Sequence, residues 1–425
     1  MKVLVVGNGG REHALAWNLL QRERIRQVIC IPGNGGTATT KGCQNLPLRV
    51  DDFEGIARFA LVQNVSLVIV GPELPLSLGI TDYLQHEGLT VFGPSKEGSQ
   101  IEASKCWAKT LMQSAGIPTP GFEVFTNLSA AIAYLETAVA PIVVKADGLA
   151  AGKGVTVAAT LEEAKTAVKT LFHDGFTTVV IEQCVTGQEV SILALTDGIS
   201  VRPLLPAQDH KRIGEGDTGE NTGGMGAYAP APLVTPALME RIEKEILKPT
   251  VNALRQRGID YRGILYAGLM ITPQGPTVLE FNCRFGDPET QAILPLLETP
   301  LEELLLACTQ KRLEQLPEIA WKPGVAVCVV AAAQGYPGTY QKGQVIMGIE
   351  QAEELGAKVF CAGTQLKQQQ LVTNGGRVLN VTATGETFEE AIATAYAAMN
   401  CIQFEGMYYR KDIGHRVVST TSSLD

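Results

Sequence analysis

The most chemically suggestive stretch of the sequence is residues 278–284, which read VLEFNCR. Side chains of a β-strand alternate between two faces, so Glu280, Asn282 and Arg284 share one face, and Leu279 lies on the apolar other. A carboxylate beside an amide oxygen suits magnesium, which also takes oxygens from the phosphates of a substrate. Arg284 can bind a carboxylate or phosphate through two parallel hydrogen bonds. The stretch predicts metal-assisted phosphate chemistry, with a plain polar sheet face as the alternative.

A glycine-rich segment at 148–154, GLAAGKG, predicts a mobile flap over nucleotide phosphates. It is not a P-loop, because its spacing is one residue short and because a strand rather than a helix follows it. A glycine-rich turn between two strands can instead lay backbone N–H groups and Lys153 over an anion. Gly148, Gly152 and Gly154 are the flexible positions, and a plain structural hairpin is the alternative.

Lys145 stands just before this segment, in the apolar stretch 141–146. Strand alternation places it on the face shared with Val143, at the end next to the flap. A lysine in an apolar strand is costly to bury unless an anion lies opposite it. We therefore interpret Lys145 as a phosphate ligand, against the alternative of an edge-strand lysine that prevents aggregation.

A second apolar strand, residues 179–185 (VVIEQCV), ends in a short polar exit, and Glu189 follows closely. This order suits a hinge whose backbone bonds the edge of an adenine while a carboxylate holds the ribose. Taken alone, the hinge is a weak signal.

The first strand runs into the glycine-rich turn GNGGRE at 7–12. It is a poor match to the dinucleotide fingerprint, because Glu12 takes the place of the third glycine and no acid occurs from Arg24 to Val50. The N-terminus of a helix nevertheless favours anions, and Arg11 adds a positive charge there. We interpret Gly9, Gly10 and Arg11 as a phosphate site, with a tight turn as the alternative.

Residues 208–226 combine acids, a histidine, two cations and several glycines in a long polar loop. Loops longer than ~12–15 residues tend to be functional. We interpret this one as a substrate-binding loop, whereas a solvated surface loop is the default reading of such a composition.

The elements that position these residues fall into three units. Short apolar runs at 3–6, 28–31, 67–70 and 90–92 alternate with helical patterns, which predicts βα units around a parallel sheet. A helix with Lys105 follows, and then a breaker cluster at 116–120. We predict domains at 1–101, 102–322 and 323–425, with a lid subdomain at about 121–186. Capping boxes at Thr160 and Thr387 open two later helices.

Composition narrows the class of protein. The 425 residues are 45% apolar and 19% charged, which excludes collagen, coiled coils and an extended disordered chain. The formal net charge of −9 provides no general field for nucleic acid or an anionic membrane. Apolar runs are shorter than the ~18 residues of a membrane span, and no signal peptide is evident, so we expect a cytoplasmic protein. Nine cysteines without a C-x-x-C pair argue against a disulfide framework and a zinc site.

Together, several motifs resemble the phosphoribosylamine-glycine ligase family of the ATP-grasp superfamily, from Met1 to about Arg416. They lie at 7–13, 141–155, 208–228, 280–290, 335–338 and 410–414. The resemblance implies a multidomain α/β and α+β fold: a Rossmann-like N-terminal domain, an ATP-grasp core with a mobile lid, and a small α+β C-terminal domain. It also implies ligation of glycine to 5-phosphoribosylamine, with ATP cleaved to ADP and phosphate, in purine synthesis.

The resemblance assigns roles to individual residues. Lys105 and Lys145 would contact the phosphates of ATP, and Glu189 its ribose. The adenine hinge would be formed by Glu182, Gln183, Cys184 and Val185. The ligands of Mg²⁺ or Mn²⁺ would be Glu280 and Asn282. The preceding strand at 266–270 lacks the further acid that many ATP-grasp enzymes have there. We expect Lys145, Arg284 and Asp209 to be catalytic, Gly9–Arg11 to hold the phosphate of phosphoribosylamine, and the 208–226 loop to hold glycine.

We expect small-molecule substrates, a monomer, and no nucleic acid or membrane partner. The alternatives are another ATP-grasp carboxylate-amine ligase or carboxylase, and a nucleotide sensor without catalysis. The presence of Lys145, Glu280, Asn282 and Arg284 together argues against the sensor.

Overall fold

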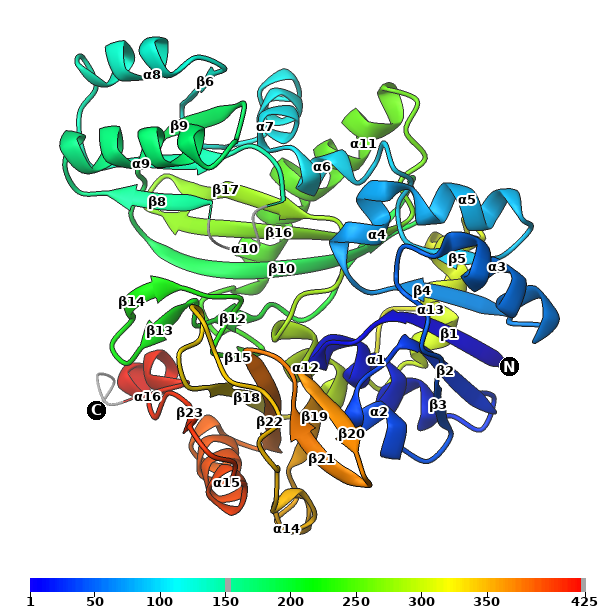
Figure 1. Ribbon diagram of the computed structural model, residues 1–425. Coiled ribbons are helices and arrows are strands. Elements are labelled where there is room, and N and C mark those ends of the chain that lie inside the picture. Colours follow the sequence, from blue (N-terminus) through cyan, green and yellow to red (C-terminus); the bar gives the residue numbers. More distant parts are fainter. Residues whose placement is uncertain (150–153, 422–425) are drawn as a thin grey trace.

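The structure is a computed structural model that describes residues 1–149 and 154–421 (Figure 1). Its N-terminal unit is a five-stranded parallel sheet in the order β3-β2-β1-β4-β5. The strands are β1 (Lys2–Gly7), β2 (Gln27–Pro32), β3 (Cys43–Asn45), β4 (Leu67–Val70) and β5 (Val91–Phe92). The helices are α1 (Gly10–Leu20), α2 (Gly35–Thr39), α3 (Phe53–Val62), α4 (Glu73–Leu78) and α5 (Ile80–His86). The parallel sheet expected from the apolar runs is confirmed.

A small α+β unit follows, which we call the lid. Its antiparallel sheet has the order β6-β9-β7-β8, and two helices cover it (Figure 1). The strands are β6 (Phe122–Phe125), β7 (Ile142–Ala146), β8 (Val155–Ala158) and β9 (Val179–Gln183), and the helices are α8 (Leu128–Leu135) and α9 (Leu161–His173). The predicted cap is present, because Thr160 Oγ1 accepts a hydrogen bond of 3.2 Å from the Glu163 N–H.

The central sheet beneath the lid is antiparallel, in the order β11-β10-β16-β17. Its strands are β10 (Gln188–Thr196), β11 (Val201–Pro203), β16 (Gly263–Thr272) and β17 (Gly275–Asn282). The associated helices are α6 (Gln100–Ala103), α7 (Lys105–Ser114), α10 (Pro236–Ile242), a π-helix (Glu243–Leu247), α11 (Lys248–Gln256), α12 (Glu289–Ile293) and α13 (Leu301–Thr309). Two 3-10 turns occur at Leu294–Leu296 and Leu313–Gln315.

The segment expected to be one polar loop contains four short strands. They are β12 (Gln208–Asp209), β13 (Arg212–Gly214), β14 (Thr218–Asn221) and β15 (Gly226–Ala229). β13 and β14 form a hairpin, whereas β12 pairs with β15, which joins β18 of the next unit. The loop prediction was wrong because the partner strand lies about a hundred residues further along the chain.

The C-terminal unit completes this sheet in the order β12-β15-β18-β22-β19, with β23 also paired to β18. Its strands are β18 (Val325–Ala333), β19 (Lys358–Cys361), β20 (Thr364–Lys367), β21 (Gln370–Thr373), β22 (Arg377–Gly385) and β23 (Met407–Tyr408). Its helices are α14 (Ile349–Glu354), α15 (Phe388–Cys401) and α16 (His415–Thr421). The predicted cap at Thr387 is present on α15.

The clusters of buried apolar residues do not coincide with the units that the sheets define. Two large apolar clusters each combine residues of the N-terminal, central and C-terminal units, for example Val3, Leu193 and Phe360 in one of them. A third cluster draws all its buried members from residues 131–181 of the lid. We call the part outside the lid the body. None of the described helices combines the length and apolarity needed to cross a membrane.

Candidate active site

The lid and the body enclose a cavity of about 890 Å³. Its lining includes lid residues, the edge of the central sheet, the β13–β14 hairpin and parts of the N- and C-terminal units. Of the predicted site residues, it is lined by Arg11, Lys105, Lys145, Gly148, Gly154, Glu182, Gln183, Cys184, Val185, Glu189, Asp209, Glu280, Asn282 and Arg284. Gly152 and Lys153, also predicted, lie outside the described residues.

Two lysines meet on one carboxylate where the lid joins the body. Glu182 Oε2 accepts hydrogen bonds from Lys145 Nζ at 3.0 Å and from Lys109 Nζ at 2.8 Å, and all three side chains are buried. Burial lowers the pKa of Lys109 to about 8, although Glu182 opposes the shift. The second oxygen, Glu182 Oε1, is buried with no hydrogen-bond partner among the described residues. It can therefore accept a donor from a ligand.

Lys109 was not predicted from the sequence as a site residue. The available signal was its position four residues after Lys105 in α7, because residues four apart share a helix face. Lys105 lines the same cavity and donates to the Gly148 carbonyl at 3.0 Å, at the base of the predicted flap. Burial lowers the pKa of Lys105, against the opposing effect of Glu280.

The predicted metal face lies on the edge strand β17. Glu280 and Asn282 both line the cavity. Burial would raise the pKa of Glu280, but Lys211, Lys145 and Lys105 lower it below its usual value. A lowered pKa keeps the carboxylate ionised, as a metal ligand must be.

The prediction that Leu279 lies with the apolar face was wrong. The pairing of β17 with β16 shifts register at this point, since Gly268 faces Glu280 and Leu269 faces Val278. Leu279 is the extra residue of a β-bulge, and it lines the cavity with Glu280. Its carbonyl accepts a hydrogen bond of 3.0 Å from Lys145 Nζ, which ties the lid to the metal face.

The chemistry of these donors fits a magnesium-type ion. Such an ion is usually held by one or two carboxylates plus the phosphate oxygens of a substrate, rather than by an all-protein cage. The described residues contain no cluster of three or more histidine, cysteine, aspartate or glutamate side chains that could hold a metal.

Lys211 is a second lysine that was not predicted as a site residue. It lies between acidic side chains on the body side of the cavity. Its Nζ lies 2.7 Å from Glu189 Oε2 and 3.9 Å from Glu280 Oε1. Burial opposes the charge, but Glu189, Asp209 and Glu280 raise the pKa of Lys211 well above its ordinary value. The signal for Lys211 was its place within the predicted substrate loop.

Asp209 is a buried acid whose pKa is unusually high. Burial raises its pKa to about 7, and Glu289 and Glu189 add to this effect while Lys211 opposes it. Glu289 in turn accepts hydrogen bonds from Tyr266 Oη at 2.6 Å and Ser191 Oγ at 3.1 Å. An acid of this kind can accept a proton near neutral pH.

Arg284 lines the cavity but is already engaged by two acids. Its Nη2 lies 2.9 Å from Glu102 Oε1, and its Nε lies 3.4 Å from Glu73 Oε2. Nη2 also donates to Asn282 Oδ1 at 3.3 Å. The arginine therefore supports the metal face and presents a partly neutralised charge to a substrate.

The predicted phosphate site at the N-terminal turn is only partly assembled. Arg11 lines the cavity, but its Nε donates to Glu12 Oε1 at 2.6 Å. The Gly9 N–H donates to the other Glu12 oxygen at 2.6 Å, so an anion already occupies that donor. Gly10 packs against Asn380 and Gln291. The Gly9 N–H thus has a partner already, because Glu12 replaces the third glycine of the fingerprint, and Gly10 is enclosed by other side chains.

Comparison with known families covers most of the chain. The family model described as "Phosphoribosylglycinamide synthetase, ATP-grasp (A) domain" matches residues 103–290. The models of the N domain and C domain of the same synthetase match residues 1–102 and 326–416.

Individual relatives agree with this result. The chain is 67% identical to a phosphoribosylamine-glycine ligase from Nostoc sp., over 99% of this chain and 100% of the relative. A ligase of the same name from Synechocystis sp. is 58% identical, over 98% of this chain and 100% of the relative. The crystal structure of the Thermotoga maritima phosphoribosylamine-glycine ligase matches with a TM-score of 0.84 at 34% identity, covering 97% of this chain and 100% of that one. The predicted multidomain α/β fold and the assignment as a ligase are confirmed, and the chain belongs to the phosphoribosylglycinamide synthetase family.

Proposed function

We propose that this chain ligates glycine to 5-phosphoribosylamine, with ATP cleaved to ADP and phosphate, and so forms glycinamide ribonucleotide. The observation that carries the proposal is the convergence of four lysines with a carboxylate-amide pair in one cavity between lid and body. The lysines are Lys105, Lys109, Lys145 and Lys211. The ATP-grasp fold implies that ATP binds with a divalent metal ion, and we propose Mg²⁺ or Mn²⁺.

ATP would lie between the lid and β17. The adenine edge would meet the backbone at Gln183–Val185, with Glu182 Oε1 as a free acceptor for a donor group of the ligand. Glu189 would hold the ribose. The phosphates would then reach Lys105 and Lys145, whose present partners are the Gly148 and Leu279 carbonyls and the Glu182 carboxylate.

In the first step, an oxygen of the glycine carboxylate attacks the γ-phosphorus. A new oxygen-phosphorus bond forms, the bond to the β-phosphate oxygen breaks, and glycyl phosphate and ADP result. Phosphoryl transfer asks a protein mainly for position and charge neutralisation, which Lys105, Lys145 and Arg284 supply. Glu280 and Asn282 would hold the metal ion, which would supply positive charge to offset that of the phosphates.

In the second step, the amine nitrogen attacks the carbonyl carbon of glycyl phosphate. A carbon-nitrogen bond forms, the carbon-oxygen bond to phosphate breaks, and the nitrogen loses a proton. Asp209, whose pKa is about 7, is placed in the cavity to accept that proton. Arg11, predicted to hold the phosphate of the amine substrate, lines the cavity on the body side. Arg212 lies on the same side, in the segment that we expected to hold glycine, and is a second candidate for that phosphate.

An acyl phosphate hydrolyses readily, so the cavity must exclude water during the reaction. Closure of the lid and its flap would do this. The cytoplasmic location and the monomeric state stay predictions, the second testable by light scattering of the purified protein.

The deciding experiment is an ADP-release assay in which ATP, glycine and 5-phosphoribosylamine are each omitted in turn. We expect release only when all three are present. Release that needs neither glycine nor the amine would exclude the proposal. Release with a different acid or amine would favour another carboxylate-amine ligase.

A further inference from the structure

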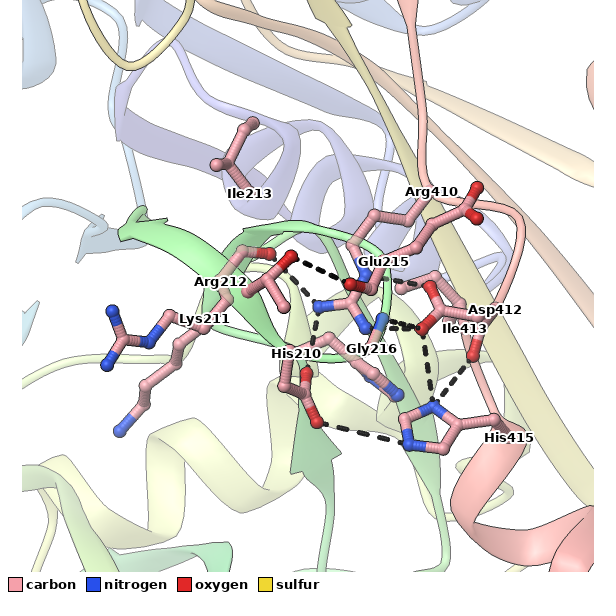
Figure 2. Close-up of polar contacts among 12 residues, drawn as sticks. His210, Lys211, Arg212, Ile213, Glu215, Gly216, Arg410, Asp412, Ile413 and His415 are labelled. Carbon is pink, nitrogen blue, oxygen red and sulfur yellow. Dashed lines mark hydrogen bonds and ion pairs between the residues drawn. The ribbon is translucent and has the colours of Figure 1, made fainter.

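The C-terminal segment 408–416 reaches back to the β13–β14 hairpin, about two hundred residues away in sequence. At its centre is Arg410, whose side chain is fully buried. Arg410 donates to both oxygens of Asp412 at 2.8 Å, a bidentate pair that fixes the plane of the guanidinium group. Figure 2 shows this pair facing the hairpin.

Arg410 and Arg416 form similar hydrogen bonds to the hairpin region. Arg410 Nη1 donates to the Arg212 carbonyl at 3.0 Å and to Asp217 Oδ1 at 2.9 Å. Arg416 Nη1 donates to the Asp209 carbonyl at 3.0 Å, and its Nη2 donates to Asp217 Oδ2 at 2.7 Å. Each arginine thus holds one backbone carbonyl of a cavity residue and one oxygen of a shared aspartate.

Further contacts hold the turn of the hairpin. Asp412 Oδ2 accepts the Gly216 N–H at 2.8 Å, Glu215 Oε1 accepts the Lys411 N–H at 3.2 Å, and Tyr408 Oη donates to the Ile213 carbonyl at 2.8 Å. Burial would raise the pKa of Asp412, but Arg410 and the Gly216 N–H lower it to about 2, so the pair stays charged at neutral pH.

These contacts set the direction in which two cationic side chains of the hairpin region point. In Figure 2 the side chains of Lys211 and Arg212 extend to one side, away from the Arg410 cluster, and both line the cavity. A short hairpin alone is marginally stable in water. External contacts are therefore needed to fix the backbone that aims Lys211, Arg212 and Asp209.

We propose that a positioning clasp is formed by Arg410, Arg416 and Asp217. The clasp fixes Asp209 and the hairpin for reaction with the phosphorylated amine substrate. It does not take part in ATP binding, which belongs to the lid side of the cavity. Arg410 touches no cavity surface and acts through Arg212 and Asp217, so it is a positioning residue. The inference rests on the proposed function, since it assigns the body side of the cavity to the amine.

The test uses two variants of the full-length protein, Arg410→Met and Asp217→Asn. The second guards against failure of the first to fold, because Asp217 has φ +56° in a turn and asparagine adopts that conformation readily. The matched control is Arg262→Met. Arg262 makes a similar pair with Asp260, two residues away, and donates to the Thr309 carbonyl, but it lies outside the cavity lining.

Two quantities are measured, kcat/KM for phosphoribosylamine by ADP release and the Kd of ATP by calorimetry. We expect kcat/KM to fall about tenfold or more in the clasp variants, as removal of a well-placed group would cost, with the Kd of ATP within twofold of the wild type. Unchanged kcat/KM in a folded variant would overturn the clasp, and so would a Kd of ATP that weakens in parallel with kcat/KM. A wild-type protein without amine-dependent ADP release would refute the proposed function instead.

Discussion

The lid and the body bury their apolar residues in different ways. Every buried member of the lid core comes from residues 131–181, whereas each body cluster combines all three of the other units. Polar contacts join the lid to the body, such as those of Lys109 Nζ with Glu182 and of Lys145 Nζ with the Leu279 carbonyl. Polar contacts can exchange partners with a ligand, and shared apolar cores cannot. From this difference we predict that the lid moves as one unit over a body that keeps its shape.

The largest expected effect comes from Lys145, which joins the two regions. Lys145→Ala removes a preorganised cation, so turnover should fall about 10²–10³-fold, or ~2.7–4 kcal/mol, while the melting curve stays cooperative. Steady-state kinetics and circular dichroism check this. Lys165→Ala is the control, because Lys165 is a lid lysine that pairs with Glu162 on the exposed face of α9. Wild-type turnover in a folded Lys145→Ala protein would remove the residue from the mechanism.

A matched pair of core truncations separates the two regions directly. Leu135→Ala in the lid and Leu15→Ala in the body both empty fully buried sites, at a cost of ~2–5 kcal/mol each. The lid variant should increase hydrogen exchange only in the lid and raise the KM for ATP. The body variant should lower protection in all three body units. If Leu135→Ala reduced protection from hydrogen exchange equally in the lid and the body, the two would be one cooperative unit.

The body should be more sensitive to acid than the lid, because it contains buried histidines, of which His13 is one. His13 accepts the Cys361 N–H at 2.9 Å and lies edge-on to Phe360, where the N- and C-terminal units meet. Burial lowers the pKa of His13 to about 4, with a smaller contribution from Lys358. The unfolded chain, with a pKa near 6.5, therefore binds more protons in the window between about pH 6.5 and pH 4.

The neutral, buried His13 contributes fully to the free energy of unfolding above about pH 6.5. This contribution is lost as the pH falls from there toward pH 4. Between pH 7.5 and pH 5 the loss should be ~2 kcal/mol. His13→Gln should reduce this pH dependence of the melting temperature, whereas His86→Gln, at an exposed helix end, should not. An unaltered pH dependence in His13→Gln would contradict the assignment.

The smallest expected effects come from two equivalent helix caps. Thr160 caps α9 in the lid, and Thr387 caps α15 in the body, each with a glutamate three residues later. Substitution by alanine should cost ~1 kcal/mol at either site. In Thr160→Ala, hydrogen exchange should rise in α9 alone, and the main melting transition should move only with Thr387→Ala. A shift of the main transition by both variants would argue against independent units.

The features that the sequence predicted correctly are those determined locally. The parallel strands of the N-terminal unit follow from short apolar runs, and both threonine caps follow from four-residue patterns. The contributions of Lys109 and Lys211 were missed, because each depends on an acid distant in sequence whose position only the folded chain defines. Glu12 was noted as a departure from the fingerprint, but its contacts with Gly9 and Arg11 were not predicted. Leu279 was misplaced because strand alternation cannot reveal a bulge. The role of β15 depends on its pairing with β18, far along the chain. The domain boundaries at 101 and 322 stay predictions.

The most direct test of the central claim, phosphoryl transfer and amide formation in one cavity, is an isotope-transfer experiment. Glycine labelled with ¹⁸O in both carboxylate oxygens is converted with ATP and 5-phosphoribosylamine, and the inorganic phosphate is analysed by mass spectrometry. Attack of the carboxylate on the γ-phosphorus, followed by displacement of phosphate by the amine, places one ¹⁸O atom in each phosphate formed. Phosphate free of ¹⁸O in a reaction that has formed the amide, with the lost label found in water or in the nucleotide instead, would contradict the account.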